Sequence, residues 1–583
     1  MQDLSLKKTN LTGRIKKALF DYYSKIPEIS EDYVDYLWAK WTKSKDITVY
    51  KIKKGKDDFG FIILDVGNSN IEEIWVSESN DPKNLIFSAF DRLIAEHSLL
   101  SATIHENDVK KNNLLLEYGF RPFRKIIDGE LKRDKLELST VVYFDRLKEF
   151  KQIRPYRKTE TVVIQKVNPA QSEEDIYEAV KDLFEKLGGI RKYVKKGQTV
   201  VLKPNIVADH GMLEGQYKGG VVTDLKLVKA LITFLLPTAS KIIVAEGSSI
   251  NRSATTKMFK IYGYDKLEEL FPGKVKLVDL NTDETVELPV PYKKRMASRK
   301  VPKTLLDADV IISLPVMKLH FAAVVSLAVK NLQGTMPPLE KYMTHFFGLW
   351  QNLVNIHHLV KPKLTIIDGL VGQEDFGPVS GIPKVMNLLI AGENPVAVDA
   401  TCMRIMGLDP KDSPPVLLAY IQGFGPIESE KIKIVGASVE EVRSPFKLPE
   451  INLSGGMNLK IHYDGACSGC RGYLHFVVHK LRRPDPKEPE KLLIDRPFEK
   501  PINIYLGPYE GKGINPNETN IFMGMCQLHN KDKGIHLPGC PPHAEVILKG
   551  IFQFFPDVLP PKYADETEEA KLERMLEEVL KSL

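Results

Sequence analysis

The chain has 583 residues, too many for a single hydrophobic core, so we expect two to four domains. Hydrophobic residues make up 43% of it and charged residues 27%, a composition that excludes a disordered chain. The formal net charge is only +6, and basic residues are interspersed with acidic ones, so a role in binding nucleic acid is not indicated. Short basic runs such as residues 291–295 are more typical of a solvated loop than of a binding patch.

The amino-terminal residues lack the apolar segment of a secretion signal, and no run approaches the roughly twenty apolar residues needed to cross a bilayer. We therefore expect a cytoplasmic protein with no membrane partner. Five cysteines in so long a chain, four of them in its last fifth, do not resemble a disulfide framework. In a reducing compartment such a group favours metal or redox chemistry.

Residues 1–150 predict a small α/β domain with strands at 47–50, 59–64 and 71–76 and a helix at 84–97. A later helix ends in a Tyr-Gly-Phe turn at residues 118–120, and this order resembles the GNAT acetyltransferase superfamily. That family has a glycine-rich pyrophosphate loop, whereas residues 77–83 contain two acids, a proline and no glycine. We therefore expect a degenerate domain used for partner contact or structure rather than for acetyl transfer from coenzyme A.

A polar, basic stretch at 151–158 predicts a linker to a second domain, for which we expect the bounds 158–445. Its first helix is predicted to start at the cap Ser172 and to stop at Gly188 and Gly189. Apolar strands alternate there with amphipathic helices, which predicts a mostly parallel sheet covered by helices on both faces. The expected strands are 161–164, 199–202, 241–245, 275–278, 310–312 and 364–367, and further helices are expected at 225–236 and 255–262.

Several of these strands end in charged or polar residues. In an open parallel sheet, ligands bind beyond the carboxyl ends of the strands, so such side chains can converge on one crevice. Each residue alone is equally consistent with a helix cap or a solvated loop, but the set together favours a site. Its cations suit a carboxylate or phosphate substrate, and its acids and histidines can carry protons. The candidate catalytic residues are Lys203, Glu246, Lys318, His320 and Asp368, and the candidate substrate-binding residues are Asn205, Lys330, Asn331, His345 and Glu374.

The same region carries six short motifs, at residues 203–205, 313–320, 330–334, 368–369, 377–381 and 394–400. Together they resemble the domain of unknown function 362 family over about residues 160–440. Members of that family are often described as iron-sulfur-binding proteins or are fused to ferredoxin modules, so the resemblance implies a cluster, though no particular reaction. A fainter likeness, Lys318 and His320 followed by His345, is similar to nickel-pincer lactate racemases.

Four cysteines near the carboxyl end predict a metal module. Cys467 and Cys470 can hold one metal centre from a single turn, and Cys526 and Cys540 arrive from separate loops. Glycines near the thiols leave space and free N–H groups for hydrogen bonds to sulfur. The Gly-Cys-Pro-Pro turn at Cys540 is similar to one that holds a 4Fe-4S cluster in the small subunit of NADH:quinone oxidoreductases and hydrogenases. We therefore expect a 4Fe-4S cluster.

Zinc is the main rival cofactor, because four cysteines are also a structural zinc signature. Such zinc sites usually pair two Cys-x-x-Cys turns, and this chain has one. The fifth thiol, Cys402, falls in a predicted helix and is interpreted as buried and inert. Residues 566–583 predict an amphipathic helix that could dock on the protein's own core or on another subunit.

The sequence therefore predicts a three-part α/β protein with a carboxyl-terminal metal region at 446–583. The first hypothesis is an iron-sulfur oxidoreductase or electron-transfer component that acts on a small anionic substrate and has a redox protein partner. The second is a non-redox isomerase or lyase for an anionic metabolite, with a structural or Lewis-acid cluster. The third is a structural zinc-binding or assembly protein without turnover.

Overall fold

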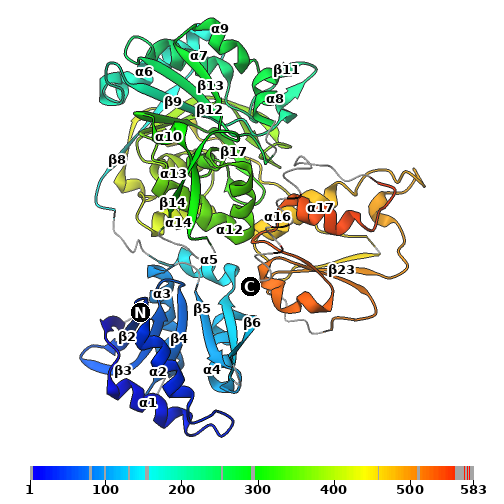
Figure 1. Cartoon of the computed structure of the whole chain (residues 1–583). Helices are drawn as coiled ribbons and strands as arrows, with labels where there is room; N and C mark the ends of the chain where they lie inside the picture. The colour runs from blue at the N-terminus through cyan, green and yellow to red at the C-terminus, as the bar shows by residue number, and fades with distance from the viewer. Residues whose placement is uncertain are drawn as a thin grey trace.

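The computed structural model describes residues 4–77, 82–97, 100–128, 131–150, 156–250, 254–290, 296–456, 458–508, 513–558 and the single positions 570, 574 and 577. Much of the expected linker and of the 77–83 loop, the basic run 291–295 and nearly all of the predicted terminal helix lie outside these residues. Figure 1 shows three parts in contact: the amino-terminal part in blue and cyan, the central part mainly in green, and the carboxyl-terminal part in orange.

The described residues of the amino-terminal domain form a seven-stranded sheet in the order β1-β2-β3-β4-β5-β7-β6. Strands β4 and β5 are parallel and pair at just two positions, Asn70 with Ser101 and Ile71 with Ala102. The strands are β1 (Leu4–Thr9), β2 (Ile47–Lys54), β3 (Asp57–Asp65), β4 (Asn70–Val76), β5 (Ser101–His105), β6 (Phe120–Asp128) and β7 (Leu131–Leu138). The helices are α1 (Gly13–Tyr23), α2 (Tyr33–Lys43), α3 (Pro82–Glu96), α4 (Val109–Tyr118) and α5 (Thr140–Lys148). The strands and the helix predicted in this region are present.

The central domain contains a ten-stranded sheet whose main path is β13-β12-β9-β16-β19-β20-β8-β21, and β17 extends it beside β19. Its strands are β8 (Glu160–Lys166), β9 (Thr199–Pro204), β12 (Lys241–Glu246), β13 (Val275–Asp279), β16 (Val310–Leu314), β17 (Val316–His320), β18 (Val324–Val325), β19 (Leu364–Glu374), β20 (Ile382–Gly392) and β21 (Ile432–Gly436). Two hairpins lie outside this sheet, β10 (Met212–Leu213) with β11 (Gln216–Tyr217) and β14 (Thr285–Pro289) with β15 (Ser298–Pro302).

The expectation of a mostly parallel sheet needs one correction, because the sheet is mixed. Strand β20 is antiparallel to both of its neighbours, β19 and β8. The other strands of the main path run in one direction. Since β19 leads into β20 through the short segment 375–381, a hairpin replaces the helical crossover that a parallel pair would need.

Helices cover both faces of this sheet, as predicted. Val200 and Leu202 of β9 pack with the residues of α6 and α7, whereas Val201 packs on the opposite face with Ile356 of α12. The predicted cap Ser172 is present and forms a capping box, in which its side chain accepts from the Asp175 N–H. The helices are α6 (Glu173–Lys186), α7 (Leu225–Leu235), α8 (Ala254–Ile261), α9 (Leu267–Leu270), α10 (Lys303–Leu306), α11 (Ala328–Asn331), α12 (Pro338–Leu359), α13 (Pro395–Ile405), α14 (Pro414–Ile421) and α15 (Val439–Val442).

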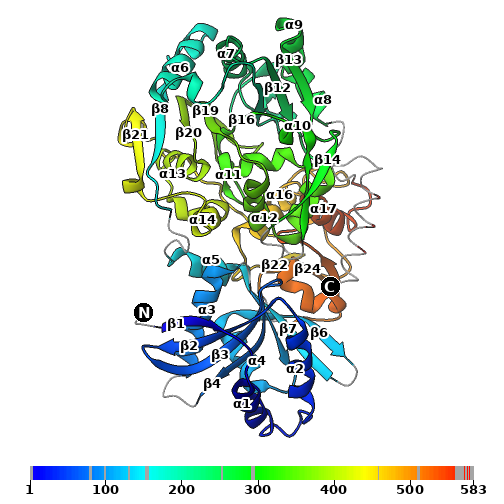
Figure 2. The ribbon, with the colours of Figure 1, turned by 60° about the vertical axis from the view of Figure 1, so that its left-hand side comes forward.

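The carboxyl-terminal part is a second small α/β unit, which the sequence had predicted simply as a cysteine module. Its four strands pair in parallel in the order β22-β23-β24-β25. They are β22 (Leu459–His462), β23 (Ile502–Leu506), β24 (Thr519–Met523) and β25 (Ile535–Leu537), accompanied by helices α16 (Ser468–His479) and α17 (Ala544–Phe552) and the 3-10 helix η8 (Met525–Lys533). Figure 2 shows this unit against both of the other parts.

Helix α12 is interrupted at Gly348, whose φ of 117° and ψ of 97° are not helical. In a regular helix the N–H of Leu349 would donate to the carbonyl of His345, four residues earlier. Here the peptide of Cys540 stands between them. The Cys540 N–H donates to the His345 carbonyl at 2.9 Å, and the Cys540 carbonyl accepts from the Leu349 N–H at 2.9 Å. The interruption of α12 thus attaches a candidate metal ligand to the central domain.

Among the residues that the structure describes, no helix combines the length and the apolar character required to span a membrane.

Candidate functional site

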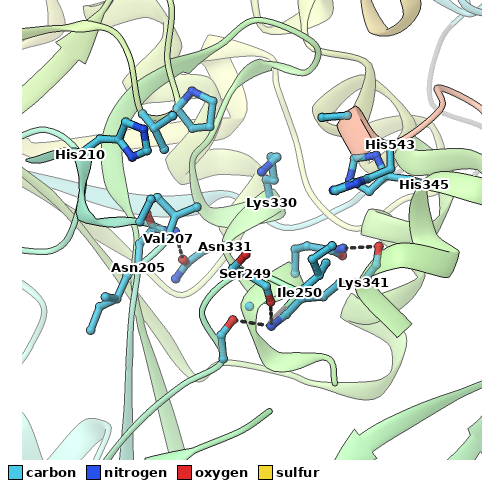
Figure 3. Close-up of a pocket in the computed structure, with 18 of the residues that line it drawn as sticks. Asn205, Val207, His210, Ser249, Ile250, Lys330, Asn331, Lys341, His345 and His543 are labelled. Atoms are coloured by element: carbon cyan, nitrogen blue, oxygen red, sulfur yellow. Dashed lines mark hydrogen bonds between the residues drawn. The ribbon is translucent and has the colours of Figure 1, made fainter. Parts of the chain in front are cut away.

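A cavity of about 270 Å³ lies between the central domain and the carboxyl-terminal unit. Five of the residues predicted from the sequence line it: Asn205, Glu246, Lys330, Asn331 and His345. The carboxyl-terminal unit contributes Tyr473 and Phe476 from α16 and His543 and Ala544 from the start of α17. The site is therefore built from two domains, and Figure 3 shows ten of its residues labelled.

Beneath the cavity wall lies a buried polar network centred on Lys203. Its ammonium donates to Glu246 at 2.9 Å, to Asn331 Oδ1 at 3.2 Å and to the Pro204 carbonyl at 2.8 Å. Glu246 also accepts from the N–H groups of Ile206 and Gly247. Burial lowers the pKa of Lys203, and Glu246 opposes that shift. The network thus balances the negative charge of the acidic side chain in the cavity wall.

Lys318, on strand β17, continues this network through Asn205. Its ammonium donates to Asn205 Oδ1 and to the Val221 carbonyl, each at 2.7 Å. The side chain is fully buried, and burial, reinforced by the charge of Lys330, holds its pKa well below the usual range. Asn205 in turn donates to Asn331 at 3.1 Å. Lys203 and Lys318 therefore position the cavity asparagines from behind and do not line the cavity themselves.

Lys330 differs from the other lysines of the site. Its ammonium forms no hydrogen bond or ion pair with any residue that the structure describes. Figure 3 shows it pointing into the cavity, between His210 on one side and His345 and His543 on the other. Burial, with a smaller contribution from the charge of Lys203, lowers its pKa to about 8. A cation without a protein partner in a cavity wall is suited to binding an anion.

Lys341, in contrast, is held by three acceptors: the carbonyls of Gly247 and Ser249 and Asn281 Oδ1, the last at 2.6 Å. Its pKa is lowered to about 7, chiefly by burial. It ties the loop after β12 to helix α12 and so shapes the cavity floor. The role of Lys341 could not be predicted from the sequence, because a single lysine in an amphipathic helix does not indicate which acceptors it will contact.

Two histidines from different domains meet at the side of the cavity nearest the cysteines. The rings of His345 and His543 pack edge to face with centroids 5.0 Å apart, and His345 contacts Tyr473 in the same way at 5.3 Å. Burial lowers the pKa of His543 to about 4 and that of His345 well below its usual value, so both are neutral at pH 7. His345 Nδ1 has no hydrogen-bond partner among the described residues.

Like Lys203 and Lys318, the other three candidate residues lie outside the cavity. His320 Nδ1 accepts from the N–H groups of Ala322 and Ala323 and so stabilises a turn. Asp368 accepts from the Asp224 N–H at 2.7 Å, where α7 begins, and burial raises its pKa to about 7. Glu374 pairs with Lys384 at 3.0 Å on the β19–β20 hairpin. These three side chains therefore bind nearby backbone or side-chain groups and do not reach the cavity.

The four carboxyl-terminal cysteines all follow the carboxyl ends of parallel strands. Cys467 caps α16 after β22, and Cys470 lies in the first turn of that helix. Cys526 stands in η8 directly after β24, and Cys540 follows β25. This is the edge at which α/β sheets bind ligands.

The thiols lie close enough to perturb one another. Cys467 accepts from the Cys470 thiol and from backbone N–H groups, which lowers its pKa to about 7. The pKa of Cys470 is raised by that same hydrogen bond, by burial and by the charges of the other three thiols. As the side chains stand, no three His, Cys, Asp or Glu residues in the described part of the chain are arranged to hold a metal ion.

The surroundings of the thiols nevertheless fit a thiolate-bound group. A Cβ at Gly524 would lie 3.3 Å from the Cys470 sulfur, so glycine keeps space open beside it. The backbone of Gly524 has a φ of 91°, which also favours glycine. Four thiols converging on such a space are the donor set of an iron-sulfur cluster or of structural zinc.

Residues 200–404 match the model of the family described as "Domain of unknown function (DUF362)". This match confirms the resemblance that the motifs of the central region indicated. A curated relative, "Thylakoid-associated protein sll1697" of Synechocystis sp., is 27% identical over 282 residues, which are 47% of this chain and 83% of that protein.

Solved structures resemble the amino-terminal part. A chimera of the spermidine N-acetyltransferase SpeG from Vibrio cholerae and hSSAT is 16% identical and matches 25% of this chain and 99% of its own, with a TM-score of 0.18. An acetyltransferase from Thermus thermophilus is 16% identical and matches 24% and 98%, with a TM-score of 0.19. Both of these proteins are described as acetyltransferases.

The buried Lys203 ion pair provides a test of the network. We expect Lys203→Met to lower the free energy of unfolding by about 3–5 kcal/mol, because it leaves the Glu246 carboxylate buried without its cation. Urea unfolding followed by circular dichroism measures the change. A Lys203→Met/Glu246→Gln double variant should recover part of the loss. Lys181→Met, which removes an exposed pair with Glu178, should have no measurable effect. Unchanged stability in Lys203→Met would contradict the assigned role.

Proposed function

We propose that the protein binds an iron-sulfur cluster through Cys467, Cys470, Cys526 and Cys540 and exchanges electrons between it and a small anionic substrate in the adjacent cavity. The observation that carries this proposal is that the cysteines and the cavity share the same structural elements. Helix α16 begins with two of the cysteines and continues with Tyr473 and Phe476 in the cavity wall. The segment after Cys540 leads within three residues to His543, also in that wall.

An iron-sulfur cluster suits the donor set better than zinc. All four candidate ligands are thiols, and the chain has one Cys-x-x-Cys turn where structural zinc sites usually have two. Backbone N–H groups of Gly469 and Cys470 donate to the Cys467 sulfur. In iron-sulfur proteins, such hydrogen bonds to ligand sulfur tune the reduction potential of the cluster. When bound, the cluster would supply or accept one electron at a time.

The cavity favours an anion with an apolar body. Lys330 offers an ammonium without a partner among the described residues, and the acidic residue among the described lining residues, Glu246, is already paired with Lys203. Phe321, Tyr473 and Phe476 supply aromatic surface on the side of the carboxyl-terminal unit. A small carboxylate or phosphate would therefore place its charge at Lys330 and its carbon skeleton against these rings.

Proton transfer to or from such a substrate can be carried by residues of the same wall. The Tyr473 hydroxyl and His345 Nε2 are 3.5 Å apart, and burial keeps the His345 ring neutral. Lys330, with its pKa near 8, can also give up a proton near neutral pH. This last feature supports the second candidate function as well, an isomerase or lyase in which Lys330 acts as an acid or base and the cluster does not change oxidation state.

Substitution of single cysteines tests the metal centre. We expect anaerobically purified Cys526→Ser and Cys540→Ser to lose most of their iron and acid-labile sulfide, together with the visible absorbance that dithionite bleaches. Cys402→Ser is the matched control, since this thiol is buried in α13 and outside the site. Wild-type iron content in both site variants would contradict the assignment. Zinc in place of iron in the unaltered protein would favour the structural zinc alternative.

The role of Lys330 is tested by titration with benzoate and with inorganic phosphate. We expect Lys330→Met to bind the preferred anion roughly 10- to 100-fold more weakly at pH 7, which corresponds to the loss of one charge-assisted hydrogen bond. Isothermal titration calorimetry measures the affinity, and Lys181→Met serves as the control.

The pH dependence of the same binding follows from the lowered pKa. Protonated Lys330 attracts the anion, so the affinity of the unaltered protein should fall as the pH rises through about 8. The pKa values of Lys203, behind the cavity wall, and of Lys341, in that wall, are also lowered by burial, so both lysines contribute to the pH dependence. The fall should be much shallower in Lys330→Met. An equal fall in both proteins would contradict the assignment of Lys330.

A further inference from the structure

The amino-terminal domain contacts the cysteine site directly. The hydroxyl of Thr140, the first residue of α5, lies 3.7 Å from the Cys540 sulfur. The Thr140 backbone N–H donates to Cys526 and opposes the increase in the pKa of that thiol caused by burial. One residue of the acetyltransferase-like domain therefore reaches two of the four candidate metal ligands.

A second, smaller cavity of about 20 Å³ lies at this junction. The amino-terminal domain contributes Arg121, Glu137 and Ser139 to its wall, and the carboxyl-terminal unit contributes Cys526 and Cys540. The Ser139 hydroxyl is buried and has no hydrogen-bond partner among the described residues, and the same holds for Arg121 Nε. The Ser139 hydroxyl and Arg121 Nε thus lie in the same cavity wall as Cys526 and Cys540. If the cysteines are deprotonated, their sulfurs can accept hydrogen bonds from these two donors.

Apolar packing closes the same junction. Phe123 of β6 is buried against Met525 and Leu528 of η8, and Cys540 packs against this group. Figures 1 and 2 show β6 on the side of the domain that faces the carboxyl-terminal unit. The contact therefore combines an apolar seal with hydrogen-bond donors directed at sulfur.

We infer that the amino-terminal domain is the cover of the cysteine site: Phe123 seals it from water, and Thr140 donates hydrogen bonds to the sulfurs of Cys526 and Cys540. This inference rests on the proposed metal centre. Hydrogen bonds to ligand sulfur stabilise the extra negative charge of the reduced cluster and so raise its reduction potential. Exclusion of water limits the oxidation of the thiolates. The acetyltransferase-like fold thus has a use that does not require coenzyme A.

The role of Thr140 is tested by the midpoint potential of the bound cluster. Thr140→Val keeps the shape of the side chain and removes the hydroxyl, so the potential should fall relative to the unaltered protein. Thr140→Ser keeps the hydroxyl and should retain the original potential. Spectroelectrochemical titration of the full-length proteins gives both values. Equal potentials in all three proteins would overturn the hydrogen-bonding role of Thr140.

The cover itself is tested without any metal. In metal-free full-length protein, Phe123→Asp should accelerate alkylation of Cys526 and Cys540 by N-ethylmaleimide at least several-fold, as followed by peptide mass spectrometry. Cys402, buried in α13, should stay unlabelled and so report that the fold is intact. Unchanged labelling of Cys526 and Cys540 in a folded variant would overturn the cover. If the unaltered protein holds no iron, the proposed function is wrong. The labelling rates still show whether the amino-terminal domain covers the cysteines.

Discussion

The peptide of Cys540, inserted between His345 and Leu349 of α12, is the interaction that joins the carboxyl-terminal unit to the central domain at the candidate site. It replaces one helical hydrogen bond, and Gly348 allows this because its backbone angles suit glycine. The insertion places a candidate metal ligand one hydrogen bond from a histidine that lines the cavity. Any shift of the Cys540 loop would therefore move helix α12 and the cavity wall with it.

The three parts meet around the cysteines from different directions. The carboxyl-terminal unit supplies the thiols at one edge of its parallel sheet, and the central domain supplies the cavity with Lys330. The amino-terminal domain reaches the thiols through Thr140. Because Lys203 and Glu246 pair with each other, Lys330 is left as a cation of the cavity wall without a partner in the described part of the chain. The charge balance of the site thus supports the proposal that it binds an anion at Lys330.

Much of the central fold could be predicted, because its strands and helices are long, periodic and bounded by caps such as Ser172. The antiparallel direction of strand β20 could not be predicted, because an apolar run does not specify the direction in which a strand pairs. The carboxyl-terminal sheet was also missed, because strands as short as Ile535–Leu537 leave almost no periodic signal. Five of ten crevice residues line the cavity, whereas His320, Asp368 and Glu374 bind nearby backbone or side chains. Lys341 and His543 join the site through tertiary contacts that no local pattern records.

The most direct test of the central claim is X-ray absorption spectroscopy of the anaerobically purified full-length protein at the iron and zinc edges. The proposed cluster predicts iron surrounded by sulfur, with further iron atoms in the next shell and an edge that shifts on reduction with dithionite. Zinc bound by four sulfurs, with no iron and no response to reductant, would contradict it and leave the cavity as the site of any chemistry.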